Sequence, residues 1–442
     1  MASLRVSVLI AGAGLAGLTA ARDLAKKGAH VMVTEARDRV GGRVYTRHEP
    51  FHHRQHAEAG ADFIHESQDE ICKLISEVGL RRAQILPGGF TGIREIGRSR
   101  RISGRRGWFD LARRLQPEVR SFCLSESRWD GAVAKALARE SVAEWLERIH
   151  ASRDLREMTR GLRGFFLADP EDLSLLALVE QFADDGPPGD EKMFRIKGGN
   201  GRLPEVLAAG LGNRLKLQTV LRRVRQTPDG VVANVEKGGR LDEVRVDYLI
   251  CAIPASTLRD VLFDPQMADE QREAVANLKF GAATKTALQF DRSTWRKRGK
   301  PRAYGTNLPI GAVWDANEEQ RGDAGILTLL AGGRASAETQ QMLASGGPER
   351  IVKELTWLDL KKALLLASDS VSWENDAWAR GGYAVFDPGY RPILREWLSR
   401  PFGRVFFAGE HTSVKWQGYM NGAVESGLRA AEEVAAAERL QD

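Results

Sequence analysis

The sequence predicts an α/β fold with more than one domain, and three observations support it. An apolar run rich in β-branched residues (4–11) is followed by a glycine-rich turn, a helical pattern (18–28) and a second apolar run (29–35). A second strand, glycine turn and helix pattern closes the chain, as RVFFAGE and then GYMNGAVESGLRAAEEVA. Between them, short strand and helix patterns alternate within 442 residues, a length that suits two or three domains.

The composition is that of a soluble globular protein, with 43% hydrophobic and 28% charged residues. Cys72, Cys123 and Cys251 have no metal-ligand spacing and form no even disulfide set, which suits the reducing cytoplasm and predicts no bound metal. No apolar run is long enough to cross a membrane, so we expect no membrane partner. The apolar N-terminus fits a buried strand better than a signal peptide because a helix and a second strand follow it.

The net charge is +6, and arginines crowd into residues 92–108. This segment could bind a nucleic acid or an acidic partner, or it could be a solvated loop. Few aromatic residues are interleaved with the arginines, which favours the loop, and we expect no nucleic-acid partner. The residues concerned are Arg94, Arg98, Arg100, Arg101, Arg105 and Arg106.

The N-terminal turn has the spacing Gly12-x-Gly14-x-x-Gly17 of a Rossmann-like dinucleotide-binding unit. The first glycine permits the tight turn, the second lets a pyrophosphate approach the backbone, and the third lets helix and strand pack closely. The helix N-terminus that follows attracts phosphate groups. Glu35 ends the second strand, where a carboxylate can accept hydrogen bonds from a ribose diol and disfavours NADP. These residues leave NAD and FAD both open.

A second glycine pair favours FAD. Gly41 and Gly42 precede Arg43, shortly after the acid that ends the second strand. Two further glycines with an arginine suit the pyrophosphate of a longer, extended dinucleotide.

Four further blocks extend the pattern along the chain: HAEAGADFIH, GGNGRLPEVLAAGL, ATKTALQF and RVFFAGEHTSVKWQGYMNGAVESGLRAA. Together, and in this order, they resemble the flavin-dependent amine oxidases (monoamine, polyamine and L-amino-acid oxidases) over nearly the whole length. The resemblance implies a Rossmann-like FAD-binding domain of residues 1–70, 196–260 and 400–442. This domain is interleaved with an α+β substrate-binding domain of residues 71–195 and 261–399 that carries a helical cap.

The resemblance also implies the FAD contacts. Leu221 is matched to a strand that reaches the adenine, Glu410 to an acidic contact with the ribityl or phosphate region, and the helix after Gly418 to the flavin. The full expected set is Gly12, Gly14, Leu15, Ala16, Gly17, Glu35, Ala36, Arg37, Gly41, Gly42, Arg43, Gly60, Ala61, Asp62, Phe63, Leu221, Gly409, Glu410, Gly418, Tyr419 and Met420.

By the same resemblance, Lys285, Tyr383 and Tyr419 surround the reacting centre. Lys285 lies in a strand-like alternation, and the family's lysine at this position hydrogen-bonds a water that faces flavin N5. Tyr383 and Tyr419 match two facing rings that guide an amine toward the flavin. Gly381 and Gly382, just before Tyr383, are expected to let the backbone come close to the flavin ring. His65 falls on the substrate path of polyamine oxidases, although a histidine there could equally be a satisfied core or surface residue.

Two positions depart from the patterns of particular family members. Gly382 stands where monoamine oxidases with covalent flavin have a cysteine, so we expect FAD to be held without a covalent bond. L-amino-acid oxidases commonly have an arginine after the glycine segment to bind the substrate carboxylate, whereas residues 62–64 are Asp-Phe-Ile. The second departure weighs against amino-acid substrates.

The resemblance therefore implies an FAD-dependent oxidase of a primary or secondary amine. Hydride passes from the α-carbon to flavin N5, the imine is hydrolysed, and O2 reoxidises the flavin to give hydrogen peroxide. A polyamine or L-amino-acid oxidase is the nearest alternative. A desaturase or protoporphyrinogen-oxidase type of enzyme, or a non-catalytic flavoprotein that binds an acidic partner, are further ones. Amine and O2 are the expected partners, and a homodimer stays open.

Overall fold

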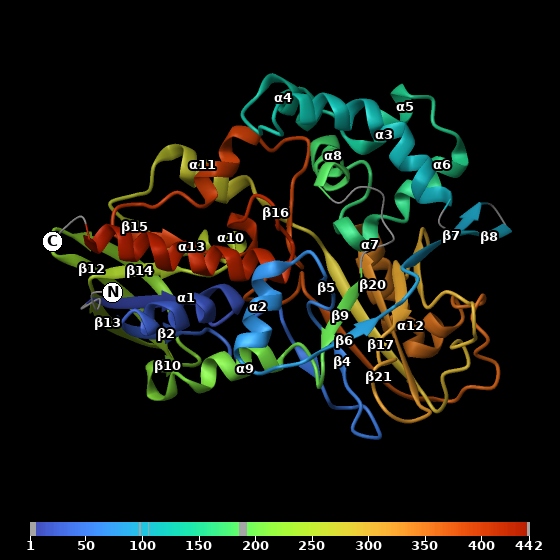
Figure 1. Ribbon diagram of the computed structural model, residues 1–442, viewed down its shortest axis with the longest axis horizontal. Coiled ribbons are helices and arrows are strands. Elements are labelled where there is room, and N and C mark those ends of the chain that lie inside the picture. The colour runs from blue at the N-terminus through green and yellow to red at the C-terminus, as the bar shows by residue number, and fades with distance from the viewer. Residues whose placement is uncertain (1–5, 97–98, 105, 185–191, 440–442) are drawn as a thin grey trace.

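The computed structural model describes residues 6–96, 99–104, 106–184 and 192–439. The side chains of residues 97–108 and 184–191 lie outside this description, and with them the predicted turn at 184–191 and most of the arginine-rich segment. The two halves of the molecule lie side by side, with a group of helices above one of them (Figure 1).

The first half is built on a five-stranded parallel sheet in the order β10–β2–β1–β14–β23. Each strand is short and apolar, as expected of strands buried on both faces. The two predicted strand–turn–helix units provide β1 and β2 at the start of the chain and β23 near its end. The strands are β1 (Ser7–Ala11), β2 (His30–Thr34), β10 (Leu215–Lys216), β14 (Tyr248–Cys251) and β23 (Val405–Phe407).

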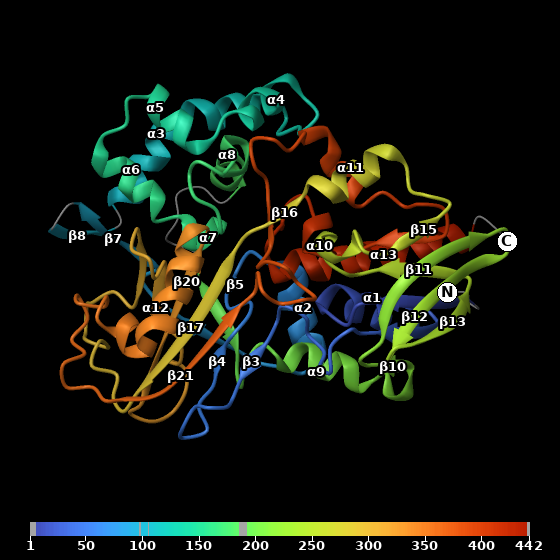
Figure 2. The same ribbon diagram turned by 180° about the vertical axis from the view of Figure 1, so that it is seen from behind.

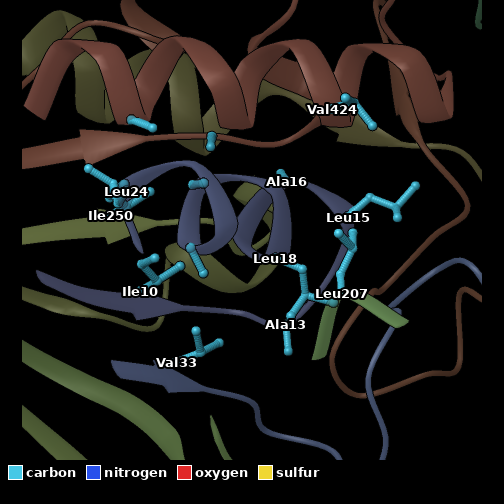
Figure 3. Close-up of a cluster of buried hydrophobic side chains, with 14 of the residues drawn as sticks. Ile10, Ala13, Leu15, Ala16, Leu18, Leu24, Val33, Leu207, Ile250 and Val424 are labelled. Carbon is cyan, nitrogen blue, oxygen red and sulfur yellow. The ribbon is translucent and has the colours of Figure 1, made fainter. Parts of the chain in front are cut away.

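Helices α1 (Leu15–Lys26) and α13 (Met420–Arg439) pack against each other beside this sheet, although they lie at opposite ends of the chain (Figure 1). Their contact buries apolar side chains in a core shared with the strands. Figure 3 shows Ile10, Val33 and Ile250 of the strands near Leu18 and Leu24 of α1, all of them buried. Leu207 of α9 (Arg202–Ala209) and Val424 of α13 complete this core from two further directions.

A four-stranded sheet in the order β13–β12–β11–β15 lies next to the parallel sheet in the same half. Its strand β15 pairs in parallel with β11, so this sheet continues beyond residue 260, where we expected the domain to change. The stretch EVRVDYLICAIP (243–254) is divided between β13 and β14. The strands are β11 (Val220–Thr227), β12 (Gly230–Lys237), β13 (Arg240–Val246) and β15 (Leu262–Asp264).

The second half contains a seven-stranded mixed sheet in the order β21–β17–β20–β19–β18–β7–β8 (Figure 2). Helix α12 (Arg334–Val352) packs on β17, β20 and β21. Strand β17, which lies between β21 and β20, is buried along its whole length, and this explains how its lysine can be an interior residue. The strands are β7 (Phe90–Ile96), β8 (Ser99–Gly104), β17 (Ala283–Phe290), β18 (Ala303–Thr306), β19 (Ala312–Asp315), β20 (Gly325–Gly332) and β21 (Leu365–Ser372).

The remaining strands of the described residues form three small sheets, in the orders β3–β4, β5–β9–β6 and β16–β22. They are β3 (Thr46–Arg47), β4 (Ala57–Glu58), β5 (Ile64–His65), β6 (Arg82–Ile85), β9 (Met193–Ile196), β16 (Lys279–Phe280) and β22 (Ala384–Val385). The other helical segments of the first half are α2 (Asp69–Glu77), α10 (Ala255–Leu258), α11 (Asp269–Asn277) and the 3-10 turns η1 (Gly212–Arg214), η2 (Pro392–Leu398) and η3 (Glu410–Thr412).

The predicted helical cap lies over the second half (Figure 1). Its helices are α3 (Arg106–Leu124), α4 (Ala132–Arg139), α5 (Val142–Arg148), α6 (Arg153–Arg160), α7 (Arg163–Phe166) and α8 (Leu175–Asp184). A capping box, in which Ser141 and Glu144 exchange hydrogen bonds, begins α5. Within the described residues, no helix combines the length and the apolar character that crossing a membrane requires.

Candidate functional site

A cavity of about 650 Å³ runs between the two halves of the molecule. One end is lined by the glycine turn, the end of β2 and the start of β11, and the other by β17, β19 and the cap helices α7 and α8. Every sequence-predicted site residue except Gly17 lines it. Segments that are hundreds of residues apart in the chain thus meet on one continuous surface.

The glycine motif at the start of α1 contains both Gly17, which does not line the cavity, and Gly14, whose backbone is open to it. A Cβ at Gly14, where α1 begins, would have no neighbour within 4 Å, so its backbone is open to the cavity. A Cβ at Gly17 would instead collide with the carbonyl oxygen of Gly12. Gly17 therefore lets helix and strand approach closely and shapes the turn in this way. Its expected direct contact with the cofactor stays a prediction.

Glu35 is held by the backbone at the end of β2. Its carboxylate accepts hydrogen bonds from the N–H of Ala13 (2.8 Å) and the N–H of Arg37 (2.9 Å). These contacts tie the glycine turn to the second strand. The Arg37 guanidinium pairs with Asp376 of the other half, so the arginine also joins distant segments. This end of the cavity is completed by Thr219, which precedes β11, and by the first residues of β11, Val220 to Arg222.

Arg43 joins three segments in the middle of the cavity. Its guanidinium donates to the carbonyl oxygen of Gly382 (2.9 Å) and to Glu410 (2.8 Å). Glu410 also accepts from the N–H of Gly418 (2.8 Å), two residues before α13 begins. The first turn of α13 thus faces the cavity through Met420, and its free N–H groups give that end a partial positive charge.

Lys285 lies at the other end of the cavity, almost completely buried in β17. Its Nζ donates to the carbonyl oxygen of Gly60 (2.8 Å) and to the carboxylate of Asp62 (2.9 Å). Burial lowers the pKa of Lys285 below its usual value, and the charge of Asp62 opposes that effect. The expected backbone role of Asp62 is therefore accompanied by a side-chain contact that the sequence did not suggest.

The aromatic residues form the wall opposite the dinucleotide end. The hydroxyl of Tyr383 donates to the carbonyl oxygen of Phe165, and burial raises the pKa of this phenol. Tyr419 packs edge-on against His65, with ring centroids 5.8 Å apart, and edge-on against Trp416 at 5.8 Å. Tyr383, Tyr419 and His65 all line the cavity, so the structure brings the three sequence-predicted side chains into one chamber.

Several lining residues were not identified from the sequence. Trp314 of β19 lies 5.0 Å from the ring of Phe63 and 5.1 Å from the Lys285 ammonium. Phe90 and Phe165 pack edge to face at 4.8 Å. These residues belong to separate elements and carry no motif of their own; the short apolar run AVW (312–314) is the nearest signal for Trp314. Other lining residues that sequence reasoning missed are Leu162, Phe166, Gln181, Met193, Trp373 and Trp378.

Gly382 is tightly enclosed. A Cβ at this position would collide with the side chain of Leu167 and lie 3.0 Å from that of Ala283. The neighbouring Gly381 has φ +143°, and a Cβ there would meet Phe280. The two glycines are therefore required by protein packing, a reason that the sequence alone did not reveal.

The arginine-rich segment was favoured as a solvated loop, and this prediction is wrong for its described residues, which form the paired strands β7 and β8 and the start of α3. Arg94 of β7 forms an ion pair with Asp154 of α6 and so links this strand to the cap. The remaining arginine side chains of the segment lie outside the described residues. Within the described part of the chain, no cluster of histidine, cysteine or carboxylate side chains could hold a metal ion.

The residues present fit FAD. The open backbone at Gly14, the acid Glu35 at the end of β2 and the helix N-terminus at Met420 are donors and acceptors suited to a pyrophosphate, a ribose and an electron-accepting ring. They lie along one elongated cavity whose far end is aromatic. An extended dinucleotide with a flat ring system suits this arrangement.

Comparison with known proteins also indicates a flavin-containing protein. The family model described as "Flavin containing amine oxidoreductase" matches residues 15–435. AofH of Mycobacterium tuberculosis, whose name places it among the flavin-containing monoamine oxidases, is 28% identical over 463 residues, covering 98% of this chain and 97% of AofH. An L-amino acid dehydrogenase of Synechocystis is 25% identical over 461 residues, covering 96% of this chain and 94% of that protein.

Among solved structures, cyclohexylamine oxidase from Brevibacterium oxydans superposes with a TM-score of 0.87 at 23% identity, covering 99% of this chain and all of that one. The likeness to solved structures confirms the predicted fold class, in which a Rossmann-like α/β unit is interleaved with an α+β unit.

Proposed function

The chain belongs to the family of flavin-containing amine oxidoreductases, and within this family we propose that it oxidises a primary or secondary monoamine with an apolar body. The observation that carries the proposal is the single cavity in which the dinucleotide end opens into an aromatic chamber containing Lys285, Tyr383 and Tyr419. FAD, when bound, supplies the hydride acceptor, and O2 then takes up the electrons to give hydrogen peroxide.

The residues of the chamber act by binding and by excluding water. Tyr383 is fixed by its hydrogen bond to Phe165, and Tyr419 by its edge contacts with His65 and Trp416. Their electron-rich ring faces suit an amine nitrogen and its adjoining carbon. The apolar surroundings favour the uncharged amine, which is the form that can give up hydride from its α-carbon.

The charged groups of the cavity support a substrate with a single amino group. Among the lining residues that the structure describes, each carboxylate already has a partner: Glu35, Asp62, Glu180, Asp260 and Glu410. A second ammonium group of a polyamine would therefore compete with Arg43, Arg395 or Lys285 for its anchor. This arrangement disfavours the polyamine alternative.

The same argument applies to amino acids. The arginines that line the described cavity, Arg37, Arg43 and Arg222, are each paired with a carboxylate of the protein. None is free to bind a substrate carboxylate in the bidentate manner. Simple amines should accordingly be oxidised with a higher kcat/KM than amino acids.

An anaerobic screen tests the proposal. Protein loaded with FAD is mixed with arylalkyl and cyclic monoamines, with diamines and polyamines, and with L-amino acids, and loss of flavin absorbance is followed. We expect monoamines to bleach the flavin fastest and air to restore the colour with release of peroxide. Faster bleaching by amino acids or polyamines would reject the substrate class, and no restoration by air would indicate a dehydrogenase.

We also propose that FAD is bound without a covalent bond, because Gly382 has no thiol and the packing of Leu167 leaves no room for one. Acid precipitation should leave yellow flavin in the supernatant. Colour that stays with the precipitated chain would contradict this.

A further inference from the structure

Asp62 is shared by three donors that come from three different strands. Its carboxylate accepts from Lys285 Nζ of β17 (2.9 Å), from Trp314 Nε1 of β19 (3.0 Å) and from Arg195 Nε of β9 (2.5 Å). The side chains of Asp62, Lys285 and Arg195 are each at most 4% exposed. One buried anion therefore faces two buried cations directly.

Two further carboxylates lie near the two cations, and the charge of Glu58 also favours the ammonium of Lys285. Glu319 lies 3.3 Å from Arg195. Glu58 accepts from the N–H of Asn200 and the hydroxyl of Thr46, and burial together with the charge of Asp62 raises the pKa of Glu58 to about 7. Across a small cavity of about 10 Å³, Lys285 also faces Arg47 and Asp369, which pair with each other.

The two neighbours of Lys285 act on its charge with opposite sign. A buried amine tends to lose its proton because the ammonium is poorly solvated there. Asp62 favours the ammonium by direct contact, whereas Arg195 disfavours it by repulsion. Burial alone would raise the pKa of Asp62, but Arg195 and Lys285 together hold it below its usual value, so the carboxylate stays ionised.

The hydrogen bonds also orient the amine. An ammonium group has three N–H donors. Gly60 and Asp62 accept two of them, and Lys285 lines the main cavity, toward which the third can point. A lysine without these two acceptors could turn away from the cavity, because its side chain has four rotatable bonds.

We propose that Asp62 and Arg195 are positioning residues that together fix the protonation and the direction of Lys285, so that one ammonium N–H is presented to the reacting end of the cavity. The inference rests on the proposed function, since the charge serves a reaction in which electrons arrive at and leave this end. A preorganised cation at such a place stabilises negative charge as it develops. The carboxylate of Asp62 and the guanidinium of Arg195 are bonded to each other and to other groups of the protein, and we assign them an action through Lys285.

Two variants with opposite predictions test this. The protein is loaded with FAD and carries isotope-labelled lysine, and the resonance that disappears in Lys285→Met is followed against pH. Asp62→Asn keeps the shape of the side chain but removes the anion, so the titration of Lys285 should move to lower pH. Arg195→Met removes the repelling cation, so the titration should move to higher pH.

Trp314→Phe is the matched control because it removes a donor to Asp62 without removing a charge, and it should leave the titration nearly in place. In the same variants, the pH above which flavin reoxidation slows should move in the same directions as the resonance. Shifts of equal sign in Asp62→Asn and Arg195→Met, or no shift in either, would overturn the proposal.

Asp62→Asn leaves two buried cations without their shared partner and can therefore lower stability enough to prevent folding. If Asp62→Asn does not fold, Arg195→Met is sufficient to test the proposal. A shift of the Lys285 titration to lower pH, or no shift, would contradict the proposed repulsion. The outcomes remain separable from those of the proposed function. Opposite shifts of the resonance in a protein that oxidises no amine would uphold the positioning and reject the reaction.

Discussion

The two ends of the cavity are built in different ways. At the dinucleotide end, the backbone provides the contacts: Gly14 is open to the cavity, and Glu35 is fixed by the N–H groups of Ala13 and Arg37. At the reacting end, side chains contact side chains, as in the group of Asp62, Lys285 and Arg195. A short stretch of sequence can specify the first kind of site, whereas the second requires strands from across the chain to meet.

The difference also decides what a substitution should change. At a backbone site, the shape of a turn matters most, so adding a single methyl group can have a large effect. At a side-chain site, a substitution that leaves Asp62 and Arg195 paired is expected to change the chemistry first. The predictions below test this contrast.

The largest effect is expected from a pair of glycine variants. Gly17→Ala places a Cβ against the Gly12 carbonyl oxygen, and overpacking of this kind typically costs about 1–3 kcal/mol or more. It should yield protein that melts at a lower temperature and binds no FAD. Gly14→Ala has no such collision and keeps an ordinary φ of −74°, so it should melt like the parent in the absence of FAD yet bind FAD more weakly. Calorimetry and flavin titration compare the two; equal melting temperatures would contradict the assignment of Gly17 to packing.

Lys285→Met should affect chemistry with little effect on cofactor binding. Loss of one preorganised charge in a buried site typically slows a reaction by about 10²–10³-fold. Stopped-flow measurement should show this slowing in flavin reduction by amine or in reoxidation by O2, with FAD still bound. Lys300→Met, at an exposed position, is the control and should match the parent. Unchanged rates in both half-reactions would remove Lys285 from the reacting centre.

Glu58→Gln should change how stability depends on pH. Burial and the charge of Asp62 raise the pKa of Glu58 to about 7, so between its unfolded pKa of 4.5 and pH 7 the folded protein keeps a proton that the unfolded chain has lost. This group therefore makes the free energy of unfolding fall as pH rises through that window, by about 3 kcal/mol at most. Urea unfolding of the protein without FAD should show a flatter dependence in Glu58→Gln; an identical slope would mean that Glu58 is ionised throughout.

The smallest effect is expected from Tyr383→Phe. The ring remains in the aromatic wall, and only the hydrogen bond to the Phe165 carbonyl is lost. We expect about 1 kcal/mol less stability and nearly unchanged kcat/KM, because the proposed role of Tyr383 depends on its ring. A large loss of kcat/KM in this variant, with stability preserved, would assign the hydroxyl itself to the reaction.

The contrast between the two ends also explains what could be predicted from sequence. Gly12, Gly14 and Glu35 follow one another within a strand–turn–helix–strand unit, so spacing alone indicated their place. The resemblance to a family added Lys285, Tyr383 and Tyr419, which no local pattern would have joined. Trp314 and Arg195 were missed because their importance arises only from tertiary contacts with Lys285 and Asp62.

The glycine pair at 381–382 shows a further limit of sequence reasoning. Its position near the reacting centre was expected, but the expected reason was approach to the flavin ring. The structure gives protein packing against Phe280 and Leu167 as a sufficient reason. A glycine in sequence indicates either an unusual backbone conformation or a close approach, and only the fold shows which atoms come close.

The contacts of Arg43 have a consequence for biosynthesis. The guanidinium bonds to partners 339 and 367 positions later in the chain, and β1 pairs with β14, which begins at Tyr248. A ribosome releases the chain from its N-terminus, so the glycine turn emerges long before the residues that enclose it. Such long-range pairing folds slowly because loops must close before the contacts form. We therefore expect FAD to be retained only after Gly382, Glu410 and β23 have been synthesised, and a chain truncated shortly before Val405 would have the whole N-terminal motif and no closed site to keep the cofactor.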